Sequence, residues 1–308
     1  MPRNLNDGSN LPPRLKVYLH MRTLEDLPDF SIWPRLEGEA ALAFLKAAGF
    51  DGIQDGDPMQ CRRIRLGSAG CGRVDKPSDA ELLVQQMKNL GHEAATVHVG
   101  TGFEDDPSTD ALVDAVLLAS DRHSFPIYIE THRATITQDI WRTIQLVKRI
   151  PAIRFNGDFS HYYTGHELTY GDFHAKLQFM QPIFDRVCFL HGRIGNSGCM
   201  QVDVGDGKSS VPQAFGRHDF VAHFRSMWTR AMCGFLTSAA PGDYLVFAPE
   251  ILSPRNYYAR QFLLPDGTVR QESDRYAQSV VLAAIARECF EAAKHCLLKN
   301  NSTTDSDS

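Results

Sequence analysis

Several features that mark other classes of protein are absent from this sequence. It has no C-x-x-C pair, and its seven cysteines are odd in number, so neither a disulfide framework nor a zinc ribbon is indicated. No apolar run approaches the roughly 20 residues that span a bilayer, and the first residues lack the apolar stretch of a secretory signal. The sequence therefore predicts a soluble, cytoplasmic protein with no membrane partner.

An excess of positive charge is missing as well. The chain carries 32 Lys and Arg residues against 37 Asp and Glu residues, which gives a formal net charge of -5. A protein that binds nucleic acid needs a broad cationic surface to meet the phosphate backbone. We therefore expect no nucleic-acid partner.

The middle of the chain also lacks a linker rich in proline, glycine and serine. We therefore expect one domain over residues 12–298 of the 308. The segments 1–11 and 299–308 are predicted to be disordered tails, the second because it is strongly polar.

What the sequence does contain is an alternation of short apolar segments of strand type with longer segments of helical period. Seven strands are predicted, at residues 15–20, 51–55, 94–99, 126–130, 152–158, 186–191 and 244–250. Continuous apolar strands separated by helices indicate a parallel sheet covered on both faces. Seven such units, with room for an eighth, favour a single-domain α/β protein with a closed (β/α)8 TIM barrel. An open doubly wound sheet is the alternative, because no eighth strand is legible.

Four of the predicted strands end in an ionisable residue, namely Glu130, Asp158, His191 and Glu250. The C-terminal ends of barrel strands converge on one mouth, so these side chains should meet. The three carboxylates among them repel one another in a low dielectric unless a cation lies between them. We therefore predict one divalent cation at this point. Oxygen-rich ligation favours Mn²⁺, with Mg²⁺, Co²⁺ and Zn²⁺ as alternatives.

Short motifs resemble those of a known superfamily. They are GFDGIQ (49–54), VHVG (97–100), IETHR (129–133), GDFSH (157–161), HGRIG (191–195) and APE (248–250). In order and spacing they are similar to the xylose isomerase-like TIM barrel superfamily, and within it to the sugar phosphate isomerase/epimerase group that includes the ketose 3-epimerases. The most diagnostic piece is the D-x-x-H formed by Asp158 and His161.

The resemblance implies that the four strand-end residues bind the metal, and that Glu130 and Glu250 also move protons. It further implies that His161 and Arg193 contact substrate oxygens. A divalent cation polarises a ketose carbonyl and acidifies the adjacent C–H bond, whose proton a carboxylate can remove. Returning the proton to the opposite face gives an epimer, and placing it on the adjacent carbon gives an aldose-ketose isomer.

Three histidines near the predicted centre have two interpretations each. His161 follows Asp158 by three residues and either contacts substrate or only hydrogen-bonds that carboxylate. His132 follows Glu130 by two residues and either orients a metal ligand or touches substrate. His98 ends a strand, where it either lines the substrate pocket or is a hydrogen-bonded core histidine.

Some residues depart from the epimerase pattern and leave other activities open. The second strand ends in Gln54 where many relatives have glutamate, and Arg193 follows the strand-end histidine by only two residues. A lyase or dehydratase could use the same first step for β-elimination on a keto-sugar, inosose or 3-keto-glycoside, and a barrel without catalysis could serve as a binding or assembly subunit. We expect a small carbohydrate as the partner, and a homo-oligomer only by analogy with other barrels.

The same superfamily also contains endonuclease IV-like DNA repair enzymes, which need a three-metal cluster. Those enzymes place an Asp-x-His pair after the strand-end histidine. Here Asp203 is followed by Val204 and Gly205, so the required histidine is missing. Together with the net negative charge, this makes DNA cleavage an unlikely activity for the chain.

Overall fold

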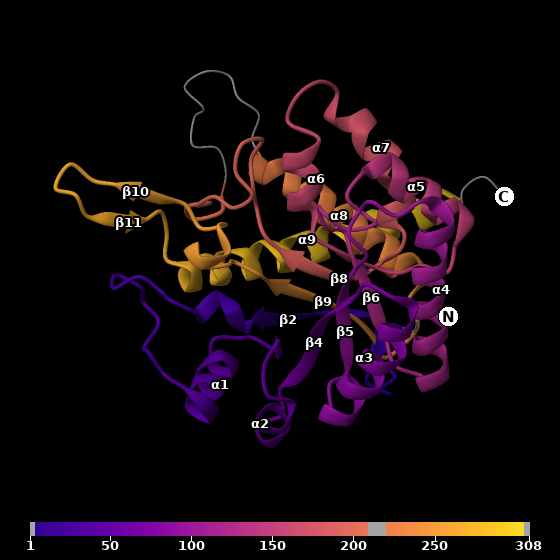
Figure 1. Cartoon of the computed structure of the whole chain (residues 1–308), viewed down its shortest axis with the longest axis horizontal. Coiled ribbons are helices and arrows are strands. Elements are labelled where there is room, and N and C mark those ends of the chain that lie inside the picture. Colours follow the sequence, from indigo (N-terminus) through magenta and orange to yellow (C-terminus); the bar gives the residue numbers. More distant parts are fainter. Residues whose placement is uncertain (1–3, 209–219, 305–308) are drawn as a thin grey trace.

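The computed structural model shown in Figure 1 describes residues 4–208 and 220–304. The strands are β1 (Leu5–Asn6), β2 (Arg14–His20), β3 (Gly52–Gln54), β4 (Gly67–Val74), β5 (Ala94–Val99), β6 (Ile127–Glu130), β7 (Phe155–Gly157), β8 (Val187–Gly192), β9 (Asp243–Pro249), β10 (Gln261–Leu263) and β11 (Val269–Gln271). The helices are α1 (Gly38–Ala47), α2 (Pro58–Arg63), α3 (Pro77–Leu90), α4 (Asp106–His123), α5 (Ile140–Arg149), α6 (Phe159–Gly165), α7 (Phe173–Phe184), α8 (Phe220–Ser238) and α9 (Arg275–Thr304). Two short 3-10 turns, η1 (Met21–Leu24) and η2 (Pro254–Asn256), follow β2 and β9.

The eight strands β2 to β9 form a closed parallel barrel. They lie side by side in chain order, and β9 pairs in parallel with both β8 and β2. The helices pack around the outside of the strands (Figure 1). This arrangement confirms the predicted (β/α)8 TIM barrel. The open-sheet alternative is wrong, because the pairing of β2 with β9 leaves no free edge.

The strand that the sequence analysis did not find is β4, with the sequence GSAGCGRV. It contains three glycines and no apolar run, so its composition hides it. The glycines are needed because large side chains from neighbouring elements fill the space beside the strand. A Cβ atom on Gly67 would collide with the ring of Tyr18, and one on Gly70 would collide with Met87 of α3. The missing apolar signal is therefore a consequence of close packing.

The N-terminal segment closes the bottom of the barrel. Leu5 and Asn6 pair antiparallel with the first two residues of β9, and Asn6 Nδ2 donates to Asp243 Oδ1 across 2.6 Å. Leu5 is only 3% exposed and joins the apolar cluster inside the barrel. The structure therefore differs from the prediction of a disordered tail over residues 1–11 at Leu5 and Asn6, which form β1. At the other end, α9 continues to Thr304, past the predicted boundary at 298; residues 1–3 and 305–308 lie outside the described part.

Two apolar layers stabilise the barrel. The layer inside it comprises Leu5, Tyr18, Ala69, Ala94, Tyr128, Cys188, Phe189, Tyr244, Val246 and Ala248. The outer layer lies between strands and helices, where Trp228 of α8 is fully buried and meets the Phe247 ring edge-on at 4.9 Å between centroids. Among the described residues, every helix is too short or too polar to cross a membrane.

Candidate metal centre

The pleat of the barrel strands aims ionisable side chains at the barrel mouth. Side chains two residues apart on a strand point to the same face. Tyr128 and Phe189 lie in the inner apolar layer, and Glu130 and His191 follow them by two residues. The same spacing places Glu250 above the inner layer at the end of β9. A polar layer therefore caps the apolar interior at the C-terminal ends of the strands.

The four residues predicted as metal ligands converge in this layer. One ligand atom from each of them lies within 4.8 Å of the ligand atoms of the other three. They come from the ends of β6 to β9, and each residue is at most 9% exposed. The set is Glu130, Asp158, His191 and Glu250.

His191 is oriented by a hydrogen bond on the far side of its ring. Its Nε2 lies 2.9 Å from Gln54 Oε1, and the amide nitrogen of Gln54 donates to Thr96 Oγ1 across 2.9 Å. Because the amide oxygen is the group that faces the ring, Nε2 carries the proton. Nδ1 lies 3.3 Å from Oε2 of both Glu130 and Glu250 and has no hydrogen-bond partner within the described residues. Nδ1 therefore faces two carboxylates, where it can bind a metal ion once it has released its proton.

A buried cation, Arg193, reaches into the same cluster. Its Nη2 donates to Asp158 and, across 2.7 Å, to Glu250 Oε2, while its Nε lies 3.2 Å from Ser160 Oγ. Burial by itself would raise the pKa of Asp158, but the charges of Arg193 and His161 outweigh it and lower the pKa to about 2. Asp158 is therefore ionised at neutral pH.

The donor set and the charge fit a divalent cation. Three ionised carboxylates and one guanidinium give three negative charges and one positive charge, so that the centre carries -2 when His191 is neutral. Three oxygen donors and one nitrogen donor suit Mn²⁺ or Mg²⁺ better than the sulfur-rich sets of structural zinc. The unpartnered Nδ1 supplies the nitrogen.

Three histidines form a row beside the carboxylates. The ring centroids of His98 and His132 are 4.1 Å apart, and those of His132 and His161 are 3.9 Å apart. His98 Nε2 lies 3.2 Å from Glu130 Oε1. His161 is 3.6 Å from Asp158 Oδ2, too far for a hydrogen bond, and neither ring nitrogen has a hydrogen-bond partner among the described residues. The row therefore contains buried polar atoms that are available to a ligand.

A cavity of about 260 Å³ opens beside Glu130, His191 and Glu250. Its other lining residues are His20, Arg22, Asp55, Cys71, Gly72, Arg73, Thr96 and His98. His98 is thus the only one of the four predicted substrate-binding residues in this lining; His132, His161 and Arg193 lie outside it. Burial raises the pKa of the Cys71 thiol well above its usual range, so this cysteine is not a thiolate nucleophile at neutral pH.

Three residues in or around the centre were not predicted. Gln54 was noted only as a departure from the epimerase pattern. His20 ends a predicted strand, so a search for ionisable residues at strand ends would have included it. Burial lowers its pKa to about 4, and its Nε2 faces Glu250 Oε1 at 3.4 Å. Tyr258 lies in the segment after β9, with its ring centroid 4.5 Å from the guanidinium carbon of Arg193, and no sequence signal marked it.

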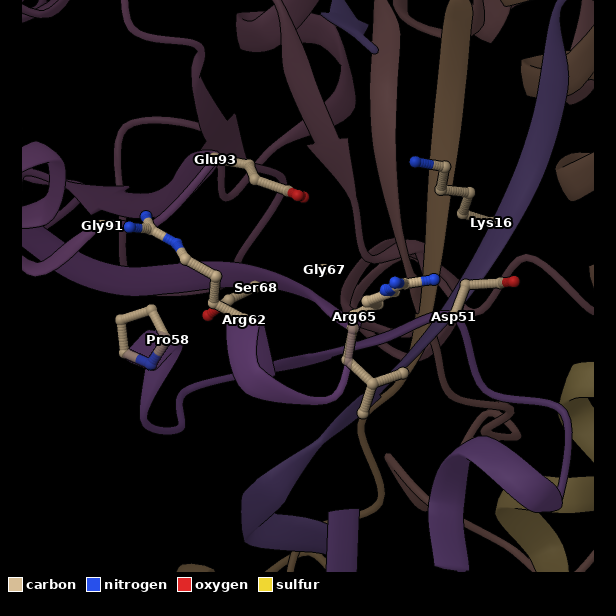
Figure 2. A pocket seen from close by; sticks show the side chains of 10 residues that line it. Lys16, Asp51, Pro58, Arg62, Arg65, Gly67, Ser68, Gly91 and Glu93 are labelled. Atoms are coloured by element: carbon tan, nitrogen blue, oxygen red, sulfur yellow. The ribbon is translucent and has the colours of Figure 1, made fainter. Parts of the chain in front are cut away.

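A second cavity, of about 510 Å³, lies at the opposite end of the barrel. Figure 2 shows Lys16, Arg62 and Glu93 around it, near the N-terminal ends of the strands. Glu93 accepts hydrogen bonds from the hydroxyl groups of Tyr18 at 2.6 Å and Tyr244 at 3.1 Å. No histidine lines this cavity. Because barrel enzymes place their chemistry at the C-terminal ends of the strands, the smaller cavity is the candidate site.

Comparison with solved structures identifies the fold. A xylose isomerase-like TIM barrel protein from Mycobacterium smegmatis in complex with magnesium matches with a TM-score of 0.51 and 12% identity, covering 89% of this chain and 97% of that one. The probable 3-DHS dehydratase AsbF, involved in petrobactin synthesis in Bacillus anthracis, matches with a TM-score of 0.50 and 11% identity, covering 88% of this chain and 97% of that one. No family model and no curated protein matches the sequence. The chain therefore has the fold of the xylose isomerase-like TIM barrels, as its motifs predicted.

Proposed function

We propose that the chain is a divalent-metal-dependent isomerase or epimerase, which moves a proton next to the carbonyl of a ketose or keto-sugar. The observation that carries the proposal is the matched placement of two carboxylates. Oε2 of Glu130 and Oε2 of Glu250 each lie 3.3 Å from His191 Nδ1. Oε1 of Glu130 faces His98 at 3.2 Å, and Oε1 of Glu250 faces His20 at 3.4 Å.

In this proposal Glu130, Asp158, His191 and Glu250 hold one divalent cation, with Mn²⁺ as the preferred ion. Such a cation acts as a Lewis acid, which polarises a substrate carbonyl and acidifies the neighbouring C–H bond. One carboxylate, Glu130 or Glu250, would then take that proton. The other would have to enter the reaction protonated to supply a proton to the opposite face, and the two would exchange protons with water between turnovers. Both line the cavity and are fixed by neighbouring side chains, as a general base must be.

The cavity also bears on the substrate. Its volume of about 260 Å³ lies just below the usual range of small-molecule pockets, about 300–1,000 Å³, which favours a ligand the size of a single sugar. Polar groups dominate its walls, and His98 can donate to a hydroxyl group. A small carbohydrate is therefore the proposed partner. The magnesium bound by one structural neighbour is consistent with a divalent cation in such a barrel.

The proposal is tested by incubating Mn²⁺-loaded protein in D₂O with a panel of ketoses and keto-glycosides, followed by mass spectrometry of label and product. Deuterium in an epimer or isomer of the added sugar supports the proposed reaction. Loss of water or of an aglycone would instead identify β-elimination, the kind of reaction named for the dehydratase among the structural neighbours. Protein stripped of metal is the control and should leave every substrate unlabelled.

A non-catalytic barrel makes a different prediction in the same experiment. No substrate would take up deuterium, and Mn²⁺ would leave the thermal stability of the protein unchanged. An ion that binds only the folded state must raise that stability. This outcome would remove both the reaction and the metal from the proposal.

A further inference from the structure

Asp158 has only one oxygen to offer a metal ion, and a cation of the protein already contacts it. Its Oδ1 accepts hydrogen bonds from the backbone N–H of Ser160 at 3.0 Å and from the Ser160 hydroxyl at 2.5 Å. Those bonds form because Asp158 is the N-cap of α6. Oδ2 remains, and Arg193 Nη2 donates to it. A metal ion at this centre would therefore need the oxygen that Arg193 holds.

Glu250 is shared in the same way. Its Oε2 lies 2.7 Å from Arg193 Nη2 and 3.3 Å from His191 Nδ1, so the oxygen nearest the nitrogen ligand is also the one bound by the guanidinium. Glu130 differs, because its Oε2 accepts from Asn156 Nδ2 across 3.1 Å and contacts His191, with no described contact to Arg193. Arg193 therefore donates hydrogen bonds to two of the four proposed ligands, Asp158 and Glu250.

We propose that Arg193 is a built-in competitor of the divalent cation, and that the ion binds by displacing its guanidinium from Asp158 and Glu250. The inference rests on the proposed function, since it concerns the same centre. Both cations seek the same lone pairs, and a buried positive charge repels a second one in a low dielectric. The competition offsets part of the carboxylate charge when no metal is bound and makes metal binding weaker.

A displaced Arg193 guanidinium would still contact a neighbouring aromatic ring. The ring centroid of Tyr258 lies 4.5 Å from its central carbon, a distance at which an aromatic face attracts a cation. Arg193 Nη1 is buried and has no hydrogen-bond partner in the described part of the chain. When Nη2 leaves the carboxylates, the side chain keeps its contact with the Tyr258 ring but loses two hydrogen bonds, and this loss lowers the net affinity for the ion. With the guanidinium retained nearby, its one positive charge and the two of the ion together balance the three carboxylates.

The test is the affinity for Mn²⁺ alone, measured by calorimetry on wild-type protein, Arg193→Met and the matched control Arg133→Met. Arg133 is an exposed arginine whose guanidinium carbon lies 5.3 Å from the centroid of the same Tyr258 ring. Its replacement removes a nearby charge and leaves Asp158 and Glu250 unchanged. We expect Arg193→Met to bind Mn²⁺ at least about fivefold more tightly than wild type, the low end of measured coupling between two sites. Arg133→Met should bind as the wild type does.

Weaker or unchanged binding in Arg193→Met, with one ion bound per wild-type chain, would overturn the competition and leave the proposed function standing. Absence of binding in both proteins would overturn the metal centre itself. Binding in Arg193→Met alone would support the competition and remove the metal from the wild-type function.

A second measurement is made on wild-type protein and needs only a variant that keeps the positive charge, in case Arg193→Met does not fold without metal. In ¹⁵N-labelled wild-type protein, Mg²⁺ should shift the Arg193 Nε–H signal, which is assigned by its loss in Arg193→Lys. A signal that stays in place while Mg²⁺ binds would contradict displacement.

Discussion

His191 donates a hydrogen bond from Nε2 to Gln54 Oε1 across 2.9 Å, and this bond decides which ring nitrogen faces the carboxylates. The orientation of the Gln54 amide is favoured because Thr96 Oγ1 accepts from its nitrogen and donates its own hydrogen toward Cys71 Sγ across 3.8 Å. The tautomer with a free Nδ1 is therefore built into the barrel by residues on β3, β5 and β8. A glutamate at position 54 would accept the same hydrogen bond.

This relationship predicts the effect of substitutions at Gln54. Gln54→Met removes the acceptor, so Mn²⁺ affinity should fall by about 10- to 100-fold, the usual cost of losing the partner of a ligating histidine. Gln54→Glu keeps an acceptor and should retain binding. The measurement is calorimetric titration with Mn²⁺, with Gln85→Met on the exposed face of α3 as the control. Equal affinity in Gln54→Met and wild type would show that another group sets the tautomer.

The pH dependence of metal binding follows from His191. Burial opposes its protonation, but the charges of Glu250 and Glu130 prevail and raise its pKa to about 9 in the metal-free protein. Below that pH a proton occupies the nitrogen that the metal needs, so apparent Mn²⁺ affinity should fall about tenfold per pH unit from 9 toward 6.5. Titrations at pH 6.5, 7.5 and 8.5 would reveal this slope, and a flat profile would contradict it.

The thermal stability of the protein should depend on the same protonation of His191. The folded-state pKa of about 9 lies above the usual value of 6.5, so protonation of His191 stabilises the metal-free protein fully below about pH 6.5, and this contribution is lost as the pH rises through about 9. The increase in melting temperature on adding Mn²⁺ should therefore grow between pH 6.5 and 9. A constant or shrinking increase would show that His191 does not exchange a proton for the metal.

The two carboxylates should both be needed for proton transfer. In Glu130→Gln and Glu250→Gln, exchange of a substrate C–H with D₂O should fall by at least about 10²-fold, because a general base is lost. Bound Mn²⁺ is quantified in the same samples, so that loss of the base is separated from loss of the metal. Glu39→Gln, an exposed residue of α1, is the matched control. Exchange at the wild-type rate in either glutamate variant would rule out its role in proton transfer.

The N-terminal segment should contribute to stability. Leu5 fills the bottom of the barrel and is 3% exposed, so Leu5→Ala should lower the free energy of unfolding by about 2 kcal/mol or more. Leu11 is 57% exposed, and Leu11→Ala should change it by less than about 0.5 kcal/mol. Urea denaturation of the two variants makes the comparison. Similar values for both would mean that the segment does not pack as described.

The metal ligands could be predicted because ionisable residues at the ends of barrel strands meet at one mouth. Apolar runs that end in Glu130, Asp158, His191 and Glu250 have a period and a terminus that can be read without a structure, and those four residues do converge. Strand β4 was not predicted because its glycines replace the apolar residues that mark a strand. They make room for Tyr18 and Met87, which can be seen only in the folded structure. The first residues were predicted to be disordered, yet Leu5 is buried and pairs with β9.

Contacts between distant segments could not be predicted in the same way. Gln54 and His191 are 137 positions apart, and an uncharged amide carries no signal of its role. Tyr258 lies in an irregular segment, so no period places its ring over Arg193. The sequence placed Arg193 near the substrate, but only the folded barrel shows its guanidinium between two proposed metal ligands.

The most direct test of the central claim is the anomalous diffraction of a crystal soaked in Mn²⁺. The account predicts one anomalous peak per chain at the C-terminal mouth of the barrel, with Glu130, Asp158, Glu250 and Nδ1 of His191 at about 2 Å from it. Arg193 Nη2 should have moved away from Asp158 in the same map. The absence of a peak between these four side chains, or a peak bound elsewhere on the chain, would contradict the proposed centre.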